Sequence, residues 1–293
     1  MSEKTISKIA VLGAGQMGRG IAQVAASVGL DVALSDVDVA TAEKGKASIA
    51  AILGKLVEKG KITQDVRDAQ IARITAVAAG EGLGDADLAV EAATEHFETK
   101  VAIMRAADDK LPAGAILATN TSSISITKLA RATKRPELVV GMHFMNPVPL
   151  MKLCEVVKGV QTSPETYALT RSLAERMGKT VITSNDHPGF MVNRILIPLL
   201  NEAAFALMEG VGTAEDIDTG AKLGLNHPMG PLELADLIGL DTVLAIADVL
   251  YREIGDDKYR APTNLKNLVA AGWLGRKTGR GFYRYDEKGA RVA

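Results

Sequence analysis

The chain has 293 residues, and its content of 47% hydrophobic and 24% charged residues is that of a globular protein with one large or two ordinary domains. Its formal net charge of −1 provides no basic field that would hold nucleic acid or an anionic membrane surface, so neither is expected as a partner. The single cysteine, Cys154, permits no internal disulfide. With no signal-peptide pattern and no apolar run near the roughly 20 residues that span a bilayer, we expect a cytoplasmic protein.

Short β-rich runs alternate with helical patterns over the first part of the chain. Strands are predicted over residues 8–12, 32–35, 86–90, 115–118, 138–142, 152–157 and 180–183. Such alternation is typical of βαβ units, so the sequence predicts an α/β fold with a mostly parallel sheet. After residue 185 the strand patterns stop, and helices are predicted over residues 189–208, 213–223, 231–251 and 263–271. We therefore predict a domain over residues 1–185 and an all-α C-terminal domain over residues 186–293.

Residues 40–70 are too long and too helical for a simple crossover between strands. Apolar residues recur there at helical spacing, at Ile49, Ile52, Leu53, Leu56 and Val57. Gly60 followed by Thr63 indicates the end of one helix and the N-cap of another. The segment is therefore predicted to form a helical hairpin inserted into the α/β domain. The glycine-rich tail, residues 272–283, is predicted to pack over the helical domain.

A glycine motif follows the first predicted strand and opens a helical run that reaches about residue 28. In Gly13-Ala-Gly15-Gln16-Met17-Gly18 the first glycine allows a tight turn, the second lets a pyrophosphate approach the backbone, and the third brings helix close to strand. Asp36 ends the second strand about 20 residues later, where a carboxylate would bind a ribose 2′-hydroxyl and repel a 2′-phosphate. The motif predicts a Rossmann-type site for NAD rather than NADP. The alternatives are a generic strand-to-helix turn and, for Asp36, a solvated turn residue.

A histidine and a carboxylate occupy two neighbouring strand-like runs. His143 ends an apolar run, and Glu155 lies in the next one, where strand alternation places it on one face with Met151 and Leu153. A carboxylate on such a face is costly unless it is paired, and the imidazole is the obvious partner. We interpret the two as a positioned acid/base pair. The alternative is a histidine with a purely structural role.

Two further polar segments follow predicted strands, at the ends where ligands bind in open α/β sheets. One carries Glu95 and Lys100, and the other carries Asn120 and Ser122. Alternatively, the first pair belongs to an exposed helix start, and Asn120 only caps a helix over residues 126–131. The four histidines show no spacing such as His-x-x-x-His, so no metal is expected.

Seven motifs in order along essentially the whole chain are similar to those of one enzyme family. They are Gly-Ala-Gly-Gln-Met-Gly (13–18), Asn-Thr-Ser-Ser (120–123), His-Phe-Met-Asn-Pro-Val-Pro (143–149), Met-Lys-Leu-Cys-Glu-Val (151–156), Pro-Gly-Phe-Met-Val-Asn-Arg (188–194), His-Pro-Met-Gly-Pro-Leu-Glu-Leu (227–234) and Gly-Arg-Lys-Thr-Gly-Arg-Gly-Phe-Tyr (275–283). The chain resembles the L-3-hydroxyacyl-CoA dehydrogenases, most closely the bacterial short-chain branch, the 3-hydroxybutyryl-CoA dehydrogenases. The resemblance implies NAD-dependent interconversion of (S)-3-hydroxyacyl-CoA and 3-ketoacyl-CoA.

The resemblance also implies roles for single residues. His143 would be the catalytic acid/base, oriented by Glu155, and Ser122 and Asn193 would be catalytic residues that hold the substrate. Contacts with NAD are implied for Gly13, Gly15, Gln16, Met17, Gly18, Asp36, Glu95, Lys100, Asn120, Ser122 and Asn146. Lys55 and Lys59, four residues apart on one helix face, would bind coenzyme A phosphates, unless they are simply solvated. Residue 145 is Met in this chain, whereas many relatives have a second Phe there, beside Phe144. Because a flexible thioether shapes a pocket differently from a ring, this difference bears on the acyl chain length that is preferred.

The two domains then have expected roles. Residues 1–185 would be the NAD-binding Rossmann domain, and residues 186–293 the helical domain for substrate binding and dimerisation. The predicted helix over residues 190–207 is hydrophobic over more than one narrow face, so a homodimer is expected. Within that helix, Asn193 could instead tie two helices together. Two other functions stay open: a dehydrogenase of a free hydroxy acid or sugar acid, and a cofactor-binding structural protein without turnover.

Overall fold

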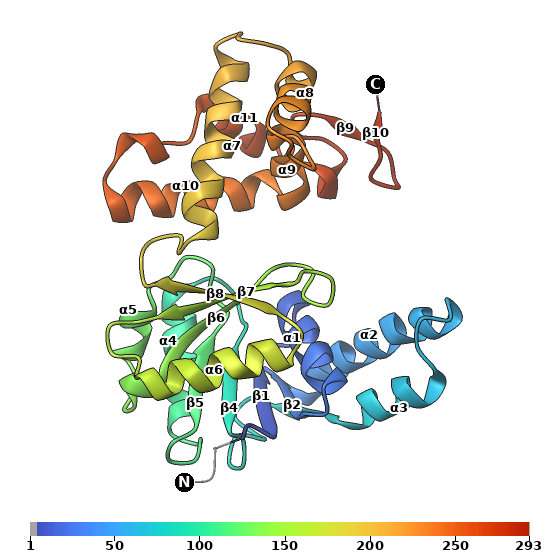
Figure 1. The fold of residues 1–293 in the computed structure, drawn as a ribbon, viewed down its shortest axis with the longest axis vertical. Helices are drawn as coiled ribbons and strands as arrows, with labels where there is room; N and C mark the ends of the chain where they lie inside the picture. The colour runs from blue at the N-terminus through green and yellow to red at the C-terminus, as the bar shows by residue number, and fades with distance from the viewer. Residues whose placement is uncertain (1–4, 293) are drawn as a thin grey trace. The chain divides into compact units, whose positions relative to one another are not determined.

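The computed structural model describes residues 5–292, which divide into two compact units between His187 and Pro188. Within the described residues, the first unit has an eight-stranded sheet in the order β3-β2-β1-β4-β5-β6-β7-β8 (Figure 1). The strands are β1 Lys8–Leu12, β2 Asp31–Asp36, β3 Ile74–Ala78, β4 Leu88–Glu91, β5 Ile116–Thr119, β6 Val139–Phe144, β7 Leu153–Lys158 and β8 Thr180–Asn185. All neighbouring pairs are parallel except β6 and β7. The predicted α/β fold with a mostly parallel sheet is confirmed.

The central strands are buried because helices cover the sheet. Every residue of β4, β5 and β6 is buried, as parallel strands with both faces covered require. The helices of this unit are α1 Gln16–Ser27, α2 Val39–Glu58, α3 Gln64–Ala72, α4 Phe97–Asp108, α5 Ile126–Ala130 and α6 Pro164–Arg176. The predicted helical hairpin is confirmed as α2 and α3, which extend to one side of the sheet in Figure 1. Thr63 caps α3, as predicted, by accepting from the backbone N–H of Val66.

The edge strand β3 was absent from the predicted strands. It follows the hairpin directly and pairs in parallel with β2. Only Ile74 of its residues is fully buried, and two of the other four are alanines. A short edge strand of small, half-exposed residues lacks the continuous apolar run that reveals a central strand, which explains why the pattern missed it.

The second unit is mainly helical, as predicted. Its helices are α7 Val192–Met208, α8 Ala214–Gly224, α9 Pro231–Ile238, α10 Leu240–Ile254 and α11 Thr263–Ala270. The prediction of one helix over residues 231–251 is wrong, because Gly239 adopts a φ of 102° and separates α9 from α10. The prediction that strands stop after residue 185 also needs correction: β9 Arg284–Tyr285 pairs antiparallel with β10 Arg291–Val292. Among residues 5–292, no helix has the length and apolarity to cross a membrane.

The glycine-rich tail packs on the helical unit, as predicted, and wraps around the buried carboxylate of Asp236. Asp236 accepts from the backbone N–H groups of Phe282 and Tyr283 at 3.0 and 2.9 Å, and from the Tyr285 hydroxyl at 2.9 Å. Burial nevertheless raises the pKa of Asp236 above its ordinary value. A Cβ at Gly281 would overlap the Asp236 carboxylate. This glycine is therefore needed because the tail wraps closely around Asp236.

Candidate functional site

The turn between β1 and α1 uses its three glycines in different ways. Gly13 adopts a φ of 117°, and a Cβ there would press on the backbone of Ala92. A Cβ at Gly18 would overlap the Gly13 carbonyl, so this glycine lets α1 pack against the turn. At Gly15, by contrast, a Cβ would meet no atom within 4 Å. The middle glycine therefore borders open space at the N-terminus of a helix, where anions bind favourably.

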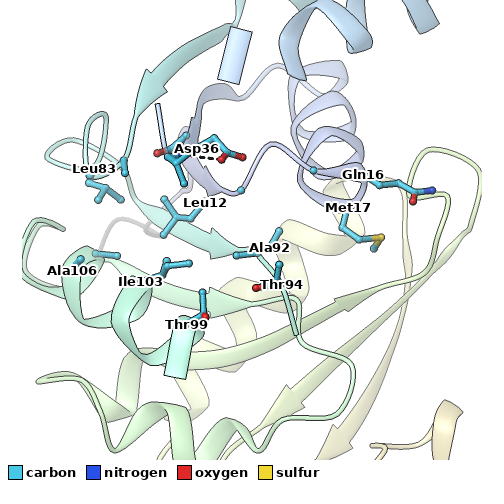
Figure 2. A pocket seen from close by; sticks show the side chains of 18 residues that line it. Leu12, Gln16, Met17, Asp36, Leu83, Ala92, Thr94, Thr99, Ile103 and Ala106 are labelled. Carbon is cyan, nitrogen blue, oxygen red and sulfur yellow. Dashed lines mark hydrogen bonds between the residues drawn. The ribbon is translucent and has the colours of Figure 1, made fainter. Parts of the chain in front are cut away.

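Asp36, the last residue of β2, is fixed beside this turn. Its Oδ2 accepts from the backbone N–H of Ala14 at 2.6 Å, and its Oδ1 accepts from that of Val37 at 2.8 Å. Figure 2 shows Asp36 among the residues that line a cavity of about 580 Å³, a size that suits a small-molecule site. The cavity is also lined by Gly13, Gly15, Gln16, Met17, Leu83, Ala92, Thr94, Thr99 and Ile103.

His143 and Glu155 meet across the antiparallel pair of strands β6 and β7. They are direct partners in the register of β6 and β7, and His143 Nδ1 donates to Glu155 Oε2 at 2.7 Å. Glu155 is 0% exposed and His143 is 6% exposed. A buried carboxylate on one ring nitrogen fixes the tautomer and orientation of the imidazole, which leaves Nε2 as the proton-accepting atom of a neutral ring.

Glu95 organises the loop after β5. Its Oε1 accepts from the Thr121 hydroxyl at 2.6 Å and from the backbone N–H groups of Ser122 and Ser123 at 2.9 and 3.0 Å. Burial raises the pKa of Glu95, but the charge of Lys100 and these hydrogen bonds outweigh burial, so the pKa lies below its ordinary value. The carboxylate is thus held ionised against the loop that carries Ser122.

Lys100 lies in a buried ion pair rather than in an exposed helix start. It is 1% exposed, and its Nζ donates to both carboxylate oxygens of Glu91 at 2.9 Å and lies 3.3 Å from Glu95 Oε2. The sequence interpretation did not single out Glu91. The available signal was a glutamate that ends an apolar strand with a lysine nine residues later, since neither charge is tolerated in a core alone.

Two asparagine side chains connect loops at the carboxyl-terminal ends of the strands. Asn120 Oδ1 accepts from the backbone N–H of Phe144 at 2.9 Å, so it joins the ends of β5 and β6. Asn146 Oδ1 accepts from Gln16 Nε2 at 2.9 Å. Asn120 is not the cap of the helix over residues 126–130. That N-cap is Ser125, and Asp186, which the sequence interpretation missed, accepts from the backbone N–H groups of the first turn.

The remaining candidates lie apart from this cluster along the chain. Lys55 is in the last turn of α2 and Lys59 is its C-cap residue, and both are exposed. Asn193 belongs to the second unit, where it is buried as the second residue of α7, and α7 begins three residues later than the helix predicted from residue 189. The helix starts late because Gly189 and Phe190 both adopt positive φ values.

A mostly parallel sheet, a glycine turn at the first strand and an acidic residue at the end of the second define a dinucleotide-binding protein of the Rossmann class. Residues 8–187 match the NAD-binding domain of 3-hydroxyacyl-CoA dehydrogenase, and residues 189–285 match the C-terminal domain of the same enzyme. The chain therefore belongs to the 3-hydroxyacyl-CoA dehydrogenase family, and NAD is the cofactor of its first unit.

Individual relatives are similar over nearly their full length. A probable 3-hydroxybutyryl-CoA dehydrogenase of Bacillus subtilis is 50% identical over 97% of this chain and 99% of its own. The 3-hydroxybutyryl-CoA dehydrogenase of Bradyrhizobium diazoefficiens is 50% identical over 96% of each chain. The crystal structure of (S)-3-hydroxybutyryl-CoA dehydrogenase from Ralstonia eutropha matches with a TM-score of 0.93 and 48% identity, over 97% of this chain and 100% of that one.

Proposed function

We propose that this protein interconverts (S)-3-hydroxyacyl-CoA and 3-ketoacyl-CoA with NAD, and that 3-hydroxybutyryl-CoA and acetoacetyl-CoA are its preferred pair. The observation that carries this proposal is the buried contact of 2.7 Å between His143 Nδ1 and Glu155 Oε2. It provides an oriented imidazole at the carboxyl-terminal end of β6, in a domain that binds a hydride-transferring cofactor. The names of the relatives support the short-chain substrate.

The residues present fit NAD. Gly15 leaves open space at the N-terminus of α1, where a pyrophosphate would lie. Each Asp36 oxygen accepts one backbone N–H and keeps a lone pair for a ribose hydroxyl. The same negative charge would repel the 2′-phosphate of NADP. When bound, NAD supplies the hydride chemistry, while the protein supplies orientation and electrostatics.

His143 would move the proton of the reaction. In the oxidative direction its Nε2 accepts the proton of the substrate 3-hydroxyl, and Glu155 stabilises the imidazolium that forms. In the reductive direction the same nitrogen returns the proton to the oxygen. General acid/base catalysis of this kind contributes roughly 10²–10⁴-fold to the rate.

Other residues would bind the substrate. We infer that Ser122 and Asn193 donate hydrogen bonds to the acyl group, and that Lys55 and Lys59 bind phosphates of coenzyme A. In the helical unit, α7 exposes Ile195 and Leu199, and we infer that a second copy of the chain covers this surface in a homodimer.

An NADH oxidation assay tests the proposal. Turnover with acetoacetyl-CoA and none with free acetoacetate is the expected result. Comparable turnover of free acetoacetate would instead favour a dehydrogenase of free hydroxy acids. Binding of NADH without any oxidation across 3-ketoacyl-CoA chain lengths would favour a cofactor-binding structural protein.

A further inference from the structure

Glu91, the last residue of β4, is a fully buried carboxylate at 0% exposure. Its Oε1 accepts from the backbone N–H of Ala93 at 2.7 Å, and its Oε2 accepts from the Thr119 hydroxyl at 2.6 Å. Both oxygens also accept from Lys100 Nζ at 2.9 Å. One side chain therefore joins the end of β4, the end of β5 and the first turns of α4.

The ammonium group of Lys100 contacts two carboxylates, those of Glu91 and Glu95. Lys100 is 1% exposed, so its ammonium group depends on protein partners rather than on water. Besides Glu91, the Nζ lies 3.3 Å from Glu95 Oε2. Because Glu91 fixes the buried ammonium from one side, the ammonium in turn fixes the place at which the Glu95 carboxylate is most stable.

The second oxygen of Glu95 reaches the loop that carries Ser122. Its Oε1 accepts from the Ser122 backbone N–H at 2.9 Å and lies 3.3 Å from the Ser122 hydroxyl oxygen, which donates to it. A continuous series of charged contacts thus runs from Glu91 through Lys100 and Glu95 to Ser122. None of its links requires the second unit.

We propose that Glu91 is a positioning residue for the reaction, which acts through Lys100 and Glu95 to set the place of Ser122. This inference rests on the proposed function, in which Ser122 contacts the substrate. A buried ion pair adds little to the stability of a fold, because well-packed apolar residues of the same volume often stabilise it as much. Such a pair can, however, hold a loop in a fixed position. Position matters here because misplacement of a reacting group by about 1 Å can lower the rate about 10²-fold.

The test is Glu91→Gln, which keeps the shape of the side chain and removes its charge. With acetoacetyl-CoA and NADH we expect kcat to fall at least about tenfold, because Glu95 and the Ser122 loop lose their fixed position. We measure kcat at saturating NADH, because the resemblance also implies NAD contacts for Glu95, Lys100 and Ser122. In a Ser122→Ala background the same substitution should lower kcat by less than about threefold further, since the positioned hydroxyl is already absent.

Asp108→Asn is the matched control. Asp108 is another buried carboxylate of the same domain, paired with the partly buried Arg135 at 2.5 Å from its Nε, at the opposite end of α4. This variant should lower the melting temperature without lowering kcat. If it lowered kcat as much as Glu91→Gln does, the effect of Glu91 would be general loss of stability, and the inference would be wrong.

Two further outcomes are decisive. Equal losses from Glu91→Gln in the wild-type and Ser122→Ala backgrounds would overturn the positioning role, while an inactive wild-type protein would overturn the proposed function itself. If Glu91→Gln does not fold, Glu91→Asp keeps the charge and shortens the side chain by one methylene group, which moves its oxygens away from Lys100 Nζ. The double-mutant cycle of this variant with Ser122→Ala is interpreted in the same way. A smaller loss of kcat in the Ser122→Ala background supports the positioning role, and equal losses overturn it.

Discussion

His143 and Glu155 lie directly opposite each other on β6 and β7, with the Nδ1 of one 2.7 Å from the Oε2 of the other. Because the two strands are antiparallel, a connection over residues 145–152 suffices to bring the pair together. The carboxylate is sealed from water and the imidazole retains a small exposed edge. This arrangement orients a titratable ring without exposing the group that orients it.

Substitution of His143 should impair turnover and leave cofactor binding intact. His143→Gln should lower kcat for acetoacetyl-CoA reduction by at least about 10²-fold, because the proton donor is lost. NADH fluorescence titration should give a dissociation constant close to that of the wild type. Near-normal turnover would remove His143 from the mechanism.

Substitution of Asp36 should change cofactor preference. Asp36→Asn retains one oxygen that can accept from Ala14 but removes the charge that opposes a 2′-phosphate. A hydrogen bond to a charged group contributes about 1.5–3 kcal/mol, so the preference for NADH over NADPH should fall by roughly tenfold or more. The ratio of kcat/KM for the two cofactors measures this. An unchanged ratio would show that Asp36 does not face the ribose.

Two glycine substitutions should separate folding from cofactor binding. Gly18→Ala places a Cβ on the Gly13 carbonyl and should lower stability by about 1–3 kcal/mol. Gly15→Ala meets no protein atom and should leave the melting temperature nearly unchanged while it weakens NADH binding. Gly220→Ala, inside α8 with open space around it, is the control and should stabilise the helix slightly. Equal NADH affinity in wild type and Gly15→Ala would argue against a pyrophosphate at this turn.

Glu95 should make stability depend on acid pH. Its pKa in the folded protein lies below the ordinary value of 4.5, so the folded state binds this proton less readily than the unfolded chain. Its contribution is complete above about pH 4.5 and is lost as the pH falls through the lower folded pKa. The difference in urea midpoint between wild type and Glu95→Gln should therefore be largest near neutral pH and shrink below about pH 4.5. A constant difference across this range would contradict the assignment.

The sheet could be predicted largely because its central strands are continuous apolar runs. The edge strand β3 was missed, since its alanines and exposed Thr75 carry little pattern. The break at Gly239 was also missed, because the apolar periodicity continues across it from α9 to α10. The antiparallel direction of β7 could have been inferred, since residues 145–152 are too few for the dozen or more that a parallel crossover needs.

The site was predicted in part. Contacts between residues at a recognisable spacing along the chain were predicted, and contacts between separate loops were not. The glycine turn and Asp36 form a motif with fixed spacing, and the pairing of His143 with Glu155 follows from the cost of a carboxylate on an apolar strand face. The partners of Lys100 and the Asp186 cap of α5 depend on how separate loops meet, which no spacing along the chain encodes. Cys154 is buried in the core, and burial raises the pKa of its thiol to about 12.

A double-mutant cycle on His143 and Glu155 is the most direct test of a carboxylate that acts through the imidazole. Glu155→Gln alone should lower kcat substantially, and the combination with His143→Ala should turn over within about threefold of His143→Ala alone. If instead the two losses multiply in the combined variant, Glu155 does not act through His143 and the oriented acid/base pair is disproved.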